Sequence, residues 1–189
     1  MSKTSKNNTV KWRKVANDVF LTPLPLVLKA IEMSNITPDM TVLDPCKGTG
    51  NFYNNLPPCK KEWAEITEGK DFFAFKERVD LIIGNPPFSI WDKWLEHTIT
   101  ITDKFCYIMG QQNLTDRRLR FLHTNGWGLT KQHLLQVDFW FGRTYICLFE
   151  KGKESIISVE DKPIVCDICN TKCQRGRKGN SVNECSLKK

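Results

Sequence analysis

The sequence of 189 residues predicts an α/β fold with a doubly wound, mostly parallel sheet that ends in an antiparallel closing strand. Two observations favour this fold. Short apolar and β-branched segments alternate with helical segments between residues 41 and 126, and this order is typical of parallel sheets. Loops with glycine or proline directly follow two of these segments, at the place where open parallel sheets bind ligands.

The composition sets further limits. Hydrophobic residues make up 40% of the chain, which is enough for a core and excludes disorder of the whole chain. No apolar run approaches the roughly twenty residues of a membrane span, and residues 1–8 are polar and lack a signal-peptide core. We therefore expect an intracellular protein, in cytoplasm or nucleus, that is neither secreted nor membrane-bound.

Positive charge is concentrated at the two ends. The net charge is +7, and residues 1–20 and 151–189 carry +4 each, so the middle is close to neutral. Basic ends suit nucleic acid, because binding to it releases counterions. Lys11, Arg13 and Lys14 of an N-terminal arm (residues 1–19) are candidate contacts, and two solvated tails are the alternative.

The first helix is predicted to begin at Thr22-Pro23, because threonine is a good N-cap and proline suits the first helical position. Its apolar stripe would contain Leu24, Val27, Leu28 and Ile31. A turn over residues 35–39 then leads into a core strand at residues 41–43.

That strand ends in Asp44-Pro45-Cys46-Lys47-Gly48-Thr49-Gly50, and a short helix over residues 51–56 follows. An acidic residue at a strand tip followed by Gly-x-Gly lets the backbone approach a ligand, and the helix beyond it offers free N–H groups. The pattern indicates a nucleotide-type cofactor loop. It does not fit the dinucleotide fingerprint or a phosphate-binding loop.

Two carboxylates follow this loop. Glu65 lies near the end of a strand predicted at residues 62–66, where it could accept hydrogen bonds from two ribose hydroxyls. Asp71 precedes Phe72, and this pair could hold and stack an adenine ring, with a solvated loop as the alternative.

An apolar strand over residues 79–84 ends in Asn85-Pro86-Pro87-Phe88. Two consecutive prolines fix φ and remove two donors, which leaves a rigid, acceptor-rich loop beside one amide and one aromatic ring. Such a loop suits gripping a flat amine. Taken alone, the tetrapeptide could equally be a turn after a buried strand.

Together the motifs resemble those of the class I S-adenosylmethionine-dependent methyltransferases, and within them the amino-methyltransferases that act on adenine N6. The matching segments are Thr22-Pro23, Asp44 to Gly50, and Asn85 to Phe88, in that order. The resemblance implies a Rossmann-like domain over residues 20–150, similar to compact phage or large-virus DNA adenine methyltransferases. Only fifteen residues separate Gly50 from Glu65, so the second half of the fold would be shortened.

The resemblance also implies which residues bind S-adenosylmethionine. They are Phe20, Thr22, Pro23, Asp44, Pro45, Gly48, Gly50, Glu65, Asp71 and Phe72. Glu65 would hold the ribose and Asp71 the adenine amino group, with Phe72 against the ring.

The proline turn would hold the target base. The Asn85 side-chain oxygen and the Pro86 carbonyl would accept hydrogen bonds from the amine, Pro87 would keep the turn rigid, and Phe88 would stack on the base. Only a flipped or unpaired adenine could enter. DNA is the expected substrate. RNA, a protein glutamine amide, and a non-catalytic zinc-containing nucleic-acid-binding adapter are the alternatives.

Target recognition has no separate domain, because the chain contains no long insertion. Residues 129–137 and 145–150 form the predicted closing strands, and the loop between them offers Trp140 and Phe141 for stacking and Arg143 for a phosphate. The two rings could instead cap the core. A partner subunit or a second copy could complete recognition.

Two further segments lie between the catalytic turn and the closing strands. Residues 89–92 form a capping box, before a helix with one apolar face: Trp91, Trp94, Leu95 and Thr98. A strand at residues 104–110 precedes a helix capped by Thr115. That helix carries three arginines that could meet phosphates or remain solvated: Arg117, Arg118 and Arg120.

Four of the eight cysteines crowd into the last 24 residues: Cys166, Cys169, Cys173 and Cys185. Without a secretory signal, such a cluster indicates a metal site, and four thiolates fill a tetrahedral zinc shell. We predict a structural zinc in a linker and tail over residues 151–189, with free thiols as the alternative.

Overall fold

The structure is a computed structural model that describes residues 21–137 and 143–160. Contacts divide the chain after Ile157 into a compact unit and a second unit, of which residues 158–160 alone are described. No helix in the described residues is long and apolar enough to cross a membrane. Several predicted site residues lie outside the described ranges: Lys11, Arg13, Lys14, Phe20, Trp140, Phe141, Cys166, Cys169, Cys173 and Cys185.

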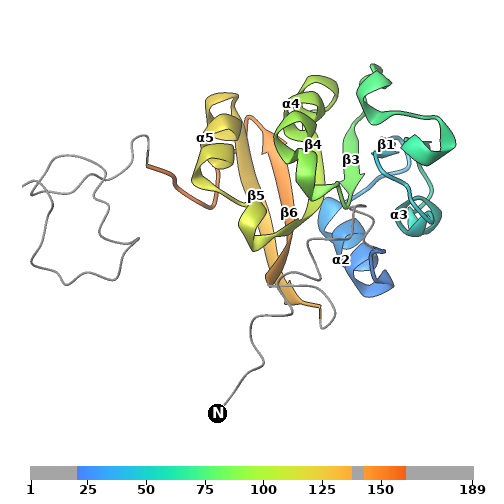
Figure 1. The fold of residues 1–189 in the computed structure, drawn as a ribbon, viewed down its shortest axis with the longest axis horizontal. Helices are drawn as coiled ribbons and strands as arrows, with labels where there is room; N and C mark the ends of the chain where they lie inside the picture. The colour runs from blue at the N-terminus through green and yellow to red at the C-terminus, as the bar shows by residue number, and fades with distance from the viewer. Residues whose placement is uncertain (1–20, 138–142, 161–189) are drawn as a thin grey trace, which may run out of the picture. The chain divides into compact units, whose positions relative to one another are not determined.

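Within the described residues, a six-stranded sheet forms the centre of the compact unit (Figure 1). Its order is β2-β1-β3-β4-β6-β5. The strands are β1 (Thr41–Asp44), β2 (Lys60–Trp63), β3 (Leu81–Gly84), β4 (Lys104–Gly110), β5 (Trp127–Gln136) and β6 (Arg143–Lys151). Strands β1 to β4 pair in parallel, and β6 is antiparallel to β4 and β5. The predicted mostly parallel sheet with an antiparallel closing strand is confirmed.

The winding of the chain reverses between β1 and β3. From β1 the chain passes to β2 on one side and returns to β3 on the other side of β1. The carboxyl ends of β1 and β3 therefore meet at the switch point where open α/β sheets bind ligands. Two 3₁₀ helices, η1 (Ile66–Glu68) and η2 (Phe72–Ala74), connect β2 to β3, so the predicted shortened half is confirmed.

Helices cover both faces of the sheet. Side chains alternate along each strand, so Ile83 and Cys106 face one side, where they pack with Val27 of α2 (Leu24–Ser34) and with Phe52 of α3 (Asn51–Asn55). Tyr107 faces the other side and contacts α4 (Trp91–Ile101). Figure 1 shows α4 and α5 (Asp116–Thr124) on the same side of the sheet.

The start of α2 differs from the prediction. Helical structure begins at Leu24, and Pro23 rather than Thr22 is the N-cap. Leu24 and Leu28 are 47% and 49% exposed, while Val27 is fully buried. Apolar residues occur on all sides of this helix, so their periodicity alone does not predict which face is buried. Packing against the sheet buries the face that carries Val27, Ala30 and Met33.

The start of α4 differs in position from the predicted capping box at residues 89–92. A 3₁₀ helix, η3 (Phe88–Ile90), continues directly from Pro87, so Ser89 lies inside it, and the N-cap of α4 is Ile90, whose side chain provides no cap. The predicted buried face of α4 is confirmed for Trp91, Trp94, Leu95 and Thr98. The Thr115 cap is also confirmed, since its side chain accepts a hydrogen bond from the Arg118 amide.

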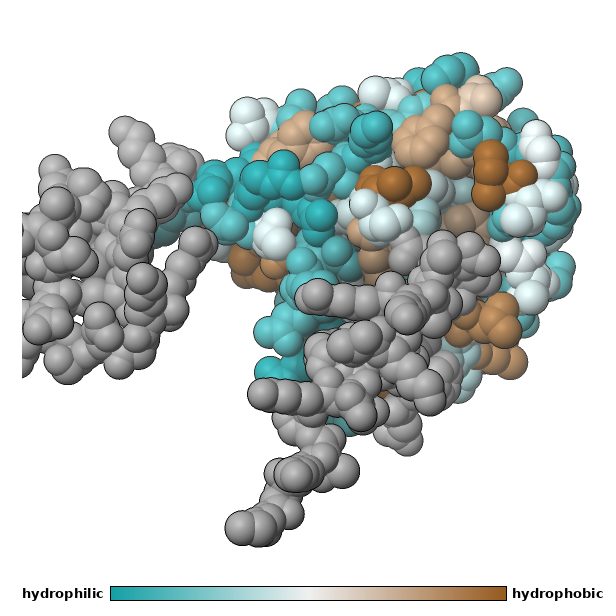
Figure 2. All heavy atoms as spheres, in the orientation of Figure 1, coloured by the Kyte–Doolittle hydropathy of each residue, from teal (hydrophilic) through white to brown (hydrophobic). Residues whose placement is uncertain are grey.

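The compact unit continues past β6. The amide of Gly152 donates to the Gly126 carbonyl at 2.7 Å, and the amide of Ile156 donates to the Leu129 carbonyl at 2.9 Å. These bonds hold residues 152–157 along β5. On the face drawn in Figure 2, hydrophobic patches lie among mostly hydrophilic residues.

Candidate cofactor and catalytic site

A cavity of about 100 Å³ lies where the cofactor loop meets the proline turn. Its lining includes Thr22, Gly48, Glu65 and Asn85, which come from four segments far apart in the sequence. The structure therefore brings three of the predicted cofactor residues, Thr22, Gly48 and Glu65, to one cavity with Asn85. The volume suits part of a nucleoside-sized ligand, so the remainder would lie over the rim.

A larger groove of about 400 Å³ runs beside β2, lined by Trp63, Phe75 and Arg78 among others. Asp71 lines this groove, whereas the lining contains no residue of the proline turn. The smaller cavity is the better candidate site, because it joins both motifs at the switch point of the sheet. Asp71 thus lines the groove, whereas Gly48, Glu65 and Asn85 line the smaller cavity.

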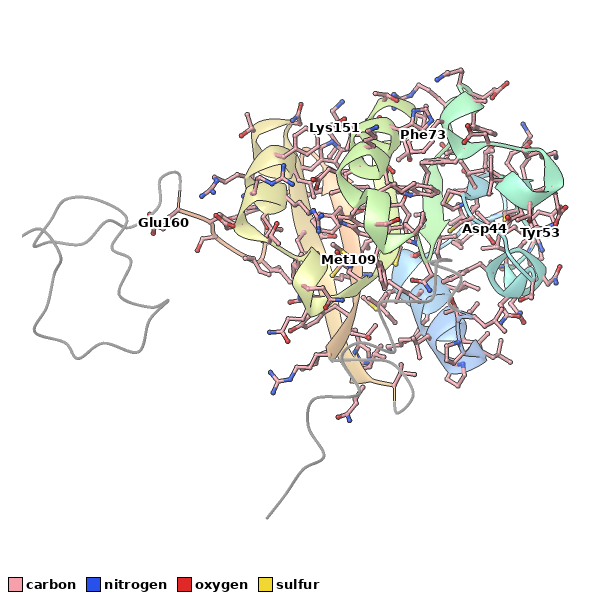
Figure 3. The ribbon with its side chains drawn as sticks, viewed as in Figure 1. Asp44, Tyr53, Phe73, Met109, Lys151 and Glu160 are labelled. Carbon is pink, nitrogen blue, oxygen red and sulfur yellow. The ribbon has the colours of Figure 1, made fainter. Side chains whose placement is uncertain are left out.

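Asp44 organises the cofactor loop from the tip of β1. The side chain is 1% exposed, and its two oxygens accept hydrogen bonds from the amides of Cys46 (3.3 Å) and Tyr53 (3.2 Å). Figure 3 shows Asp44 and Tyr53 next to each other, on the loop side of β1 and on α3. Burial raises the pKa of Asp44 to about 7, against the opposing effect of the two amides. A single carboxylate thus ties the loop to α3.

Gly48 leaves free space beside the backbone of the cofactor loop. Its φ is +51°, and a Cβ there would have only the Cys46 carbonyl within 4.0 Å. The space beside the backbone is therefore available to a ligand, and its left-handed conformation favours glycine.

Glu65 lies just beyond β2 and holds this glycine. One carboxylate oxygen accepts the Gly48 amide at 2.7 Å, and the other accepts the amide and hydroxyl of Thr67 at 3.1 and 2.7 Å. Burial alone would raise the pKa of Glu65, but these hydrogen bonds and Lys47 outweigh it and lower the pKa. A carboxylate offers about four lone-pair sites, so the ionised group retains capacity for a ligand hydroxyl.

Asn85 stands at the end of the fully buried strand β3 and is half-buried. Its backbone carbonyl accepts a hydrogen bond from the thiol of Cys46 at 3.3 Å. Pro86 is buried, Pro87 has a φ of −64°, and half-buried Phe88 lies edge-on to Trp91 with ring centroids 6.1 Å apart. Of the four residues of the turn, Asn85 lines the cavity, and Pro86, Pro87 and Phe88 do not.

The position of Phe72 corrects one prediction. Its ring is 3% exposed, stacks on Trp94 at 4.3 Å and meets His97 edge-on at 4.7 Å. These contacts place the ring in the core, so it is not available to stack on a ligand in this structure. The carboxylate of Asp71 is exposed and accepts the Phe73 amide at 3.0 Å, which starts η2.

Sequence reasoning missed two residues at the site. The Asn51 side-chain amide donates to the Thr22 carbonyl at 2.7 Å, and it joins the start of α3 to the segment before α2 at the cavity wall. Ile66 is 68% exposed and directly follows Glu65 in the sequence, so it offers an apolar surface next to that residue. The available signals were weak: an amide directly after Gly-x-Gly, and an isolated hydrophobic residue in a polar loop.

The candidate phosphate contacts have protein partners. Arg117 and Arg118 form ion pairs with Asp92, and Arg120 pairs with Asp116. Arg143 is exposed at the start of β6. In the part of the chain that the structure describes, no group of three His, Cys, Asp or Glu side chains could hold a metal.

Comparisons with solved structures concern the fold. A candidate RNA methyltransferase from Pyrococcus horikoshii is similar over 80% of this chain and 99% of its own, with 20% identity and a TM-score of 0.56. Trm5 of Methanocaldococcus jannaschii, solved with adenosine, matches 72% of this chain and 52% of its own (12% identity, TM-score 0.57). The modification subunit of a candidate type I restriction enzyme from Vibrio vulnificus matches 78% and 48% (15% identity, TM-score 0.53).

By sequence, no protein-family model and no curated protein matches the chain. At these identities the structural similarity concerns the fold alone. The six-stranded sheet, its switch point and these neighbours agree, and the described part of the chain therefore has a Rossmann-like fold similar to that of these methyltransferases.

Proposed function

We propose that this chain is an S-adenosylmethionine-dependent methyltransferase that modifies the exocyclic N6 amine of adenine in DNA. One observation carries the proposal: Gly48 and Glu65 of the cofactor side and Asn85 of the proline turn line the same cavity. A methyl donor and an amine acceptor must lie next to each other for an in-line transfer, and this cavity joins the two sites.

The residues present fit the cofactor. Glu65 offers an ionised carboxylate for ribose hydroxyls, Gly48 leaves space beside its backbone, and Ile66 offers an apolar surface next to Glu65. When bound, S-adenosylmethionine would supply an electrophilic methyl group on a sulfonium. The described site residues would bind and orient it through Thr22, Gly48, Asn51 and Glu65.

The proline turn would prepare the amine. The lone pair of the adenine amine is shared with the ring, so the nitrogen must become pyramidal before it can form a bond to carbon. Hydrogen bonds from its two hydrogens to the Asn85 side-chain oxygen and the Pro86 carbonyl would favour that geometry. On accepting the methyl group that the sulfonium would supply, the amine nitrogen would carry a positive charge, and it would then release a proton to water. Half-buried Phe88 would stack on the extruded base.

Positive charge favours a nucleic acid as the polymer that carries the adenine. The basic ends, including Lys11, Arg13 and Lys14, and the exposed Arg143 favour a nucleic acid over a protein substrate. The neighbours include a modification subunit of a candidate restriction enzyme and a candidate RNA methyltransferase, so DNA and RNA both require testing. We also propose that a partner subunit or a second copy completes target recognition, because the chain contains no long insertion that could serve as a separate recognition domain.

The test is methyl transfer from radiolabelled S-adenosylmethionine to duplex DNA, single-stranded DNA, RNA and a protein extract, followed by nucleoside and amino-acid analysis. N6-methyladenine in DNA supports the proposal. Label in RNA adenine reassigns the polymer, and label in glutamine reassigns the substrate to a protein amide. Cofactor binding without transfer to any substrate would favour an adapter.

The cysteine cluster is a separate proposal. Cys166, Cys169, Cys173 and Cys185 would hold one structural zinc in the C-terminal tail, with about tetrahedral thiolate coordination. Metal analysis of the full chain, purified under reducing conditions, tests it. A matched variant with Cys166→Ser and Cys169→Ser should lose the zinc, and a wild-type protein without zinc would contradict the proposal.

A further inference from the structure

The two prolines of the turn offer no amide donors to the neighbouring loop. Pro86 and Pro87 lack N–H groups, so the backbone between Asn85 and Phe88 has no donor for the neighbouring loop. The carbonyl that precedes both prolines, that of Asn85, accepts the thiol hydrogen of Cys46 at an S···O distance of 3.3 Å. This bond joins the turn to the cofactor loop.

Cys46 is itself held in place. Its amide donates to Asp44 at 3.3 Å, and the next amide, that of Lys47, donates to the Ala64 carbonyl at 2.9 Å. The adjacent backbone is close as well, because a Cβ at Gly84 would lie 3.1 Å from the Cδ of Pro45. The two loops therefore fit together with little room to slide.

The thiol has the protonation state that donation requires. Burial, followed by the negative charge of Asp44, raises the pKa of Cys46 well above its ordinary value. The group therefore remains an S–H donor at neutral pH. It also lines the cavity with Gly48 and Asn85, so it lies between the two halves of the site.

We infer that Cys46 is a positioning residue: its thiol holds the Asn85 carbonyl and so fixes the amine-gripping turn relative to the cofactor loop. The inference rests on the proposed function for its catalytic consequence. Its structural content is independent, because the hydrogen bond joins the two loops directly and their prolines add no amide donor. Cofactor binding to residues 46–50 would then also order the turn.

The test compares Cys46→Ala, which removes the donor, with Cys46→Ser, which retains one. Cys59→Ala is the matched control, because Cys59 is half-buried like Cys46 but packs against the core cluster that contains Val27 and Phe52, and it does not line the cavity. At saturating cofactor, we expect kcat to fall about three- to tenfold in Cys46→Ala and to stay within about threefold of wild type in Cys46→Ser. The cofactor Kd should change less than about threefold in both variants, as a positioning role requires.

A second measurement does not need catalysis. Hydrogen exchange of the amides of residues 88–90, the first after the prolines, should be faster in Cys46→Ala than in wild type and Cys46→Ser. Equal exchange in all proteins would overturn the inference, and so would an equal loss of kcat in Cys46→Ala and Cys46→Ser. If the wild type transfers no methyl group, the proposed function fails, while the exchange comparison still decides the role of Cys46.

Discussion

The amide of Gly48 donates a 2.7 Å hydrogen bond to the carboxylate of Glu65, so the predicted ribose acceptor also holds the cofactor loop. The two residues lie in loops that follow different strands: Gly48 follows β1 and Glu65 follows β2. The same carboxylate accepts two hydrogen bonds from Thr67. A ligand that binds Glu65 would therefore meet a group that is already oriented.

Glu65→Ala should weaken cofactor binding about 10- to 100-fold, because hydrogen bonds to a charged group contribute about 1.5–3 kcal/mol each. Isothermal titration with S-adenosylhomocysteine measures the change. Glu68→Ala is the matched control: this nearby carboxylate pairs with Lys47 and is 44% exposed, so its loss should change Kd less than about threefold. Equal effects of the two substitutions would remove Glu65 from the site.

Asn85→Ala should reduce kcat by about 100-fold or more while it changes the cofactor Kd little, because the lost acceptor acts on the amine in the transition state. Single-turnover transfer and cofactor titration separate the two quantities. Asn125→Ala serves as control, since Asn125 is exposed at the end of α5 and its side chain contacts only the Phe121 carbonyl among the hydrogen bonds described. Near-normal transfer by Asn85→Ala would contradict the proposed mechanism.

The motifs could be predicted because glycine and proline restrict the backbone locally. Gly48 and Gly50 have positive φ, and Pro86 and Pro87 fix the turn after β3, so these positions depend little on the rest of the fold. The order of β-branched segments likewise predicts the sheet. The burial of the Phe72 ring could not be predicted, because the ring packs against Trp94 and His97, which are more than twenty residues away in the sequence. The exposure of Leu24 and Leu28 is also decided by packing rather than by local preference.

Arg118 and Arg117 contact the same carboxylate but should differ in their contribution to stability. The Arg118 side chain is 17% exposed, donates to Asp92 at 2.6 Å, and binds the backbone and side-chain oxygens of Asn113. The Arg117 side chain is 70% exposed and contacts Asp92. Arg118→Met should lower the free energy of unfolding by about 1–3 kcal/mol, and Arg117→Met by less than about 1 kcal/mol. Urea denaturation measures the unfolding free energy of both variants. Equal losses of unfolding free energy would show that the burial of Arg118 does not increase its contribution to stability.

Asp44 should make stability depend on pH in a window set by its raised pKa. An unfolded aspartate has a pKa of 3.8, and burial raises that of Asp44 to about 7, so between these values the folded state holds a proton that the unfolded state has released. Stability from this group is therefore full below pH 4 and is lost as the pH rises through 7. The comparison is with Asp44→Asn, which does not titrate at this position, so the contributions of the other carboxylates cancel. The difference in unfolding free energy, wild type minus variant, should fall by about 2–4 kcal/mol from pH 4 to 7.5 and then level off. Urea denaturation across this range measures it, and a difference that stays constant would show that Asp44 is ionised throughout.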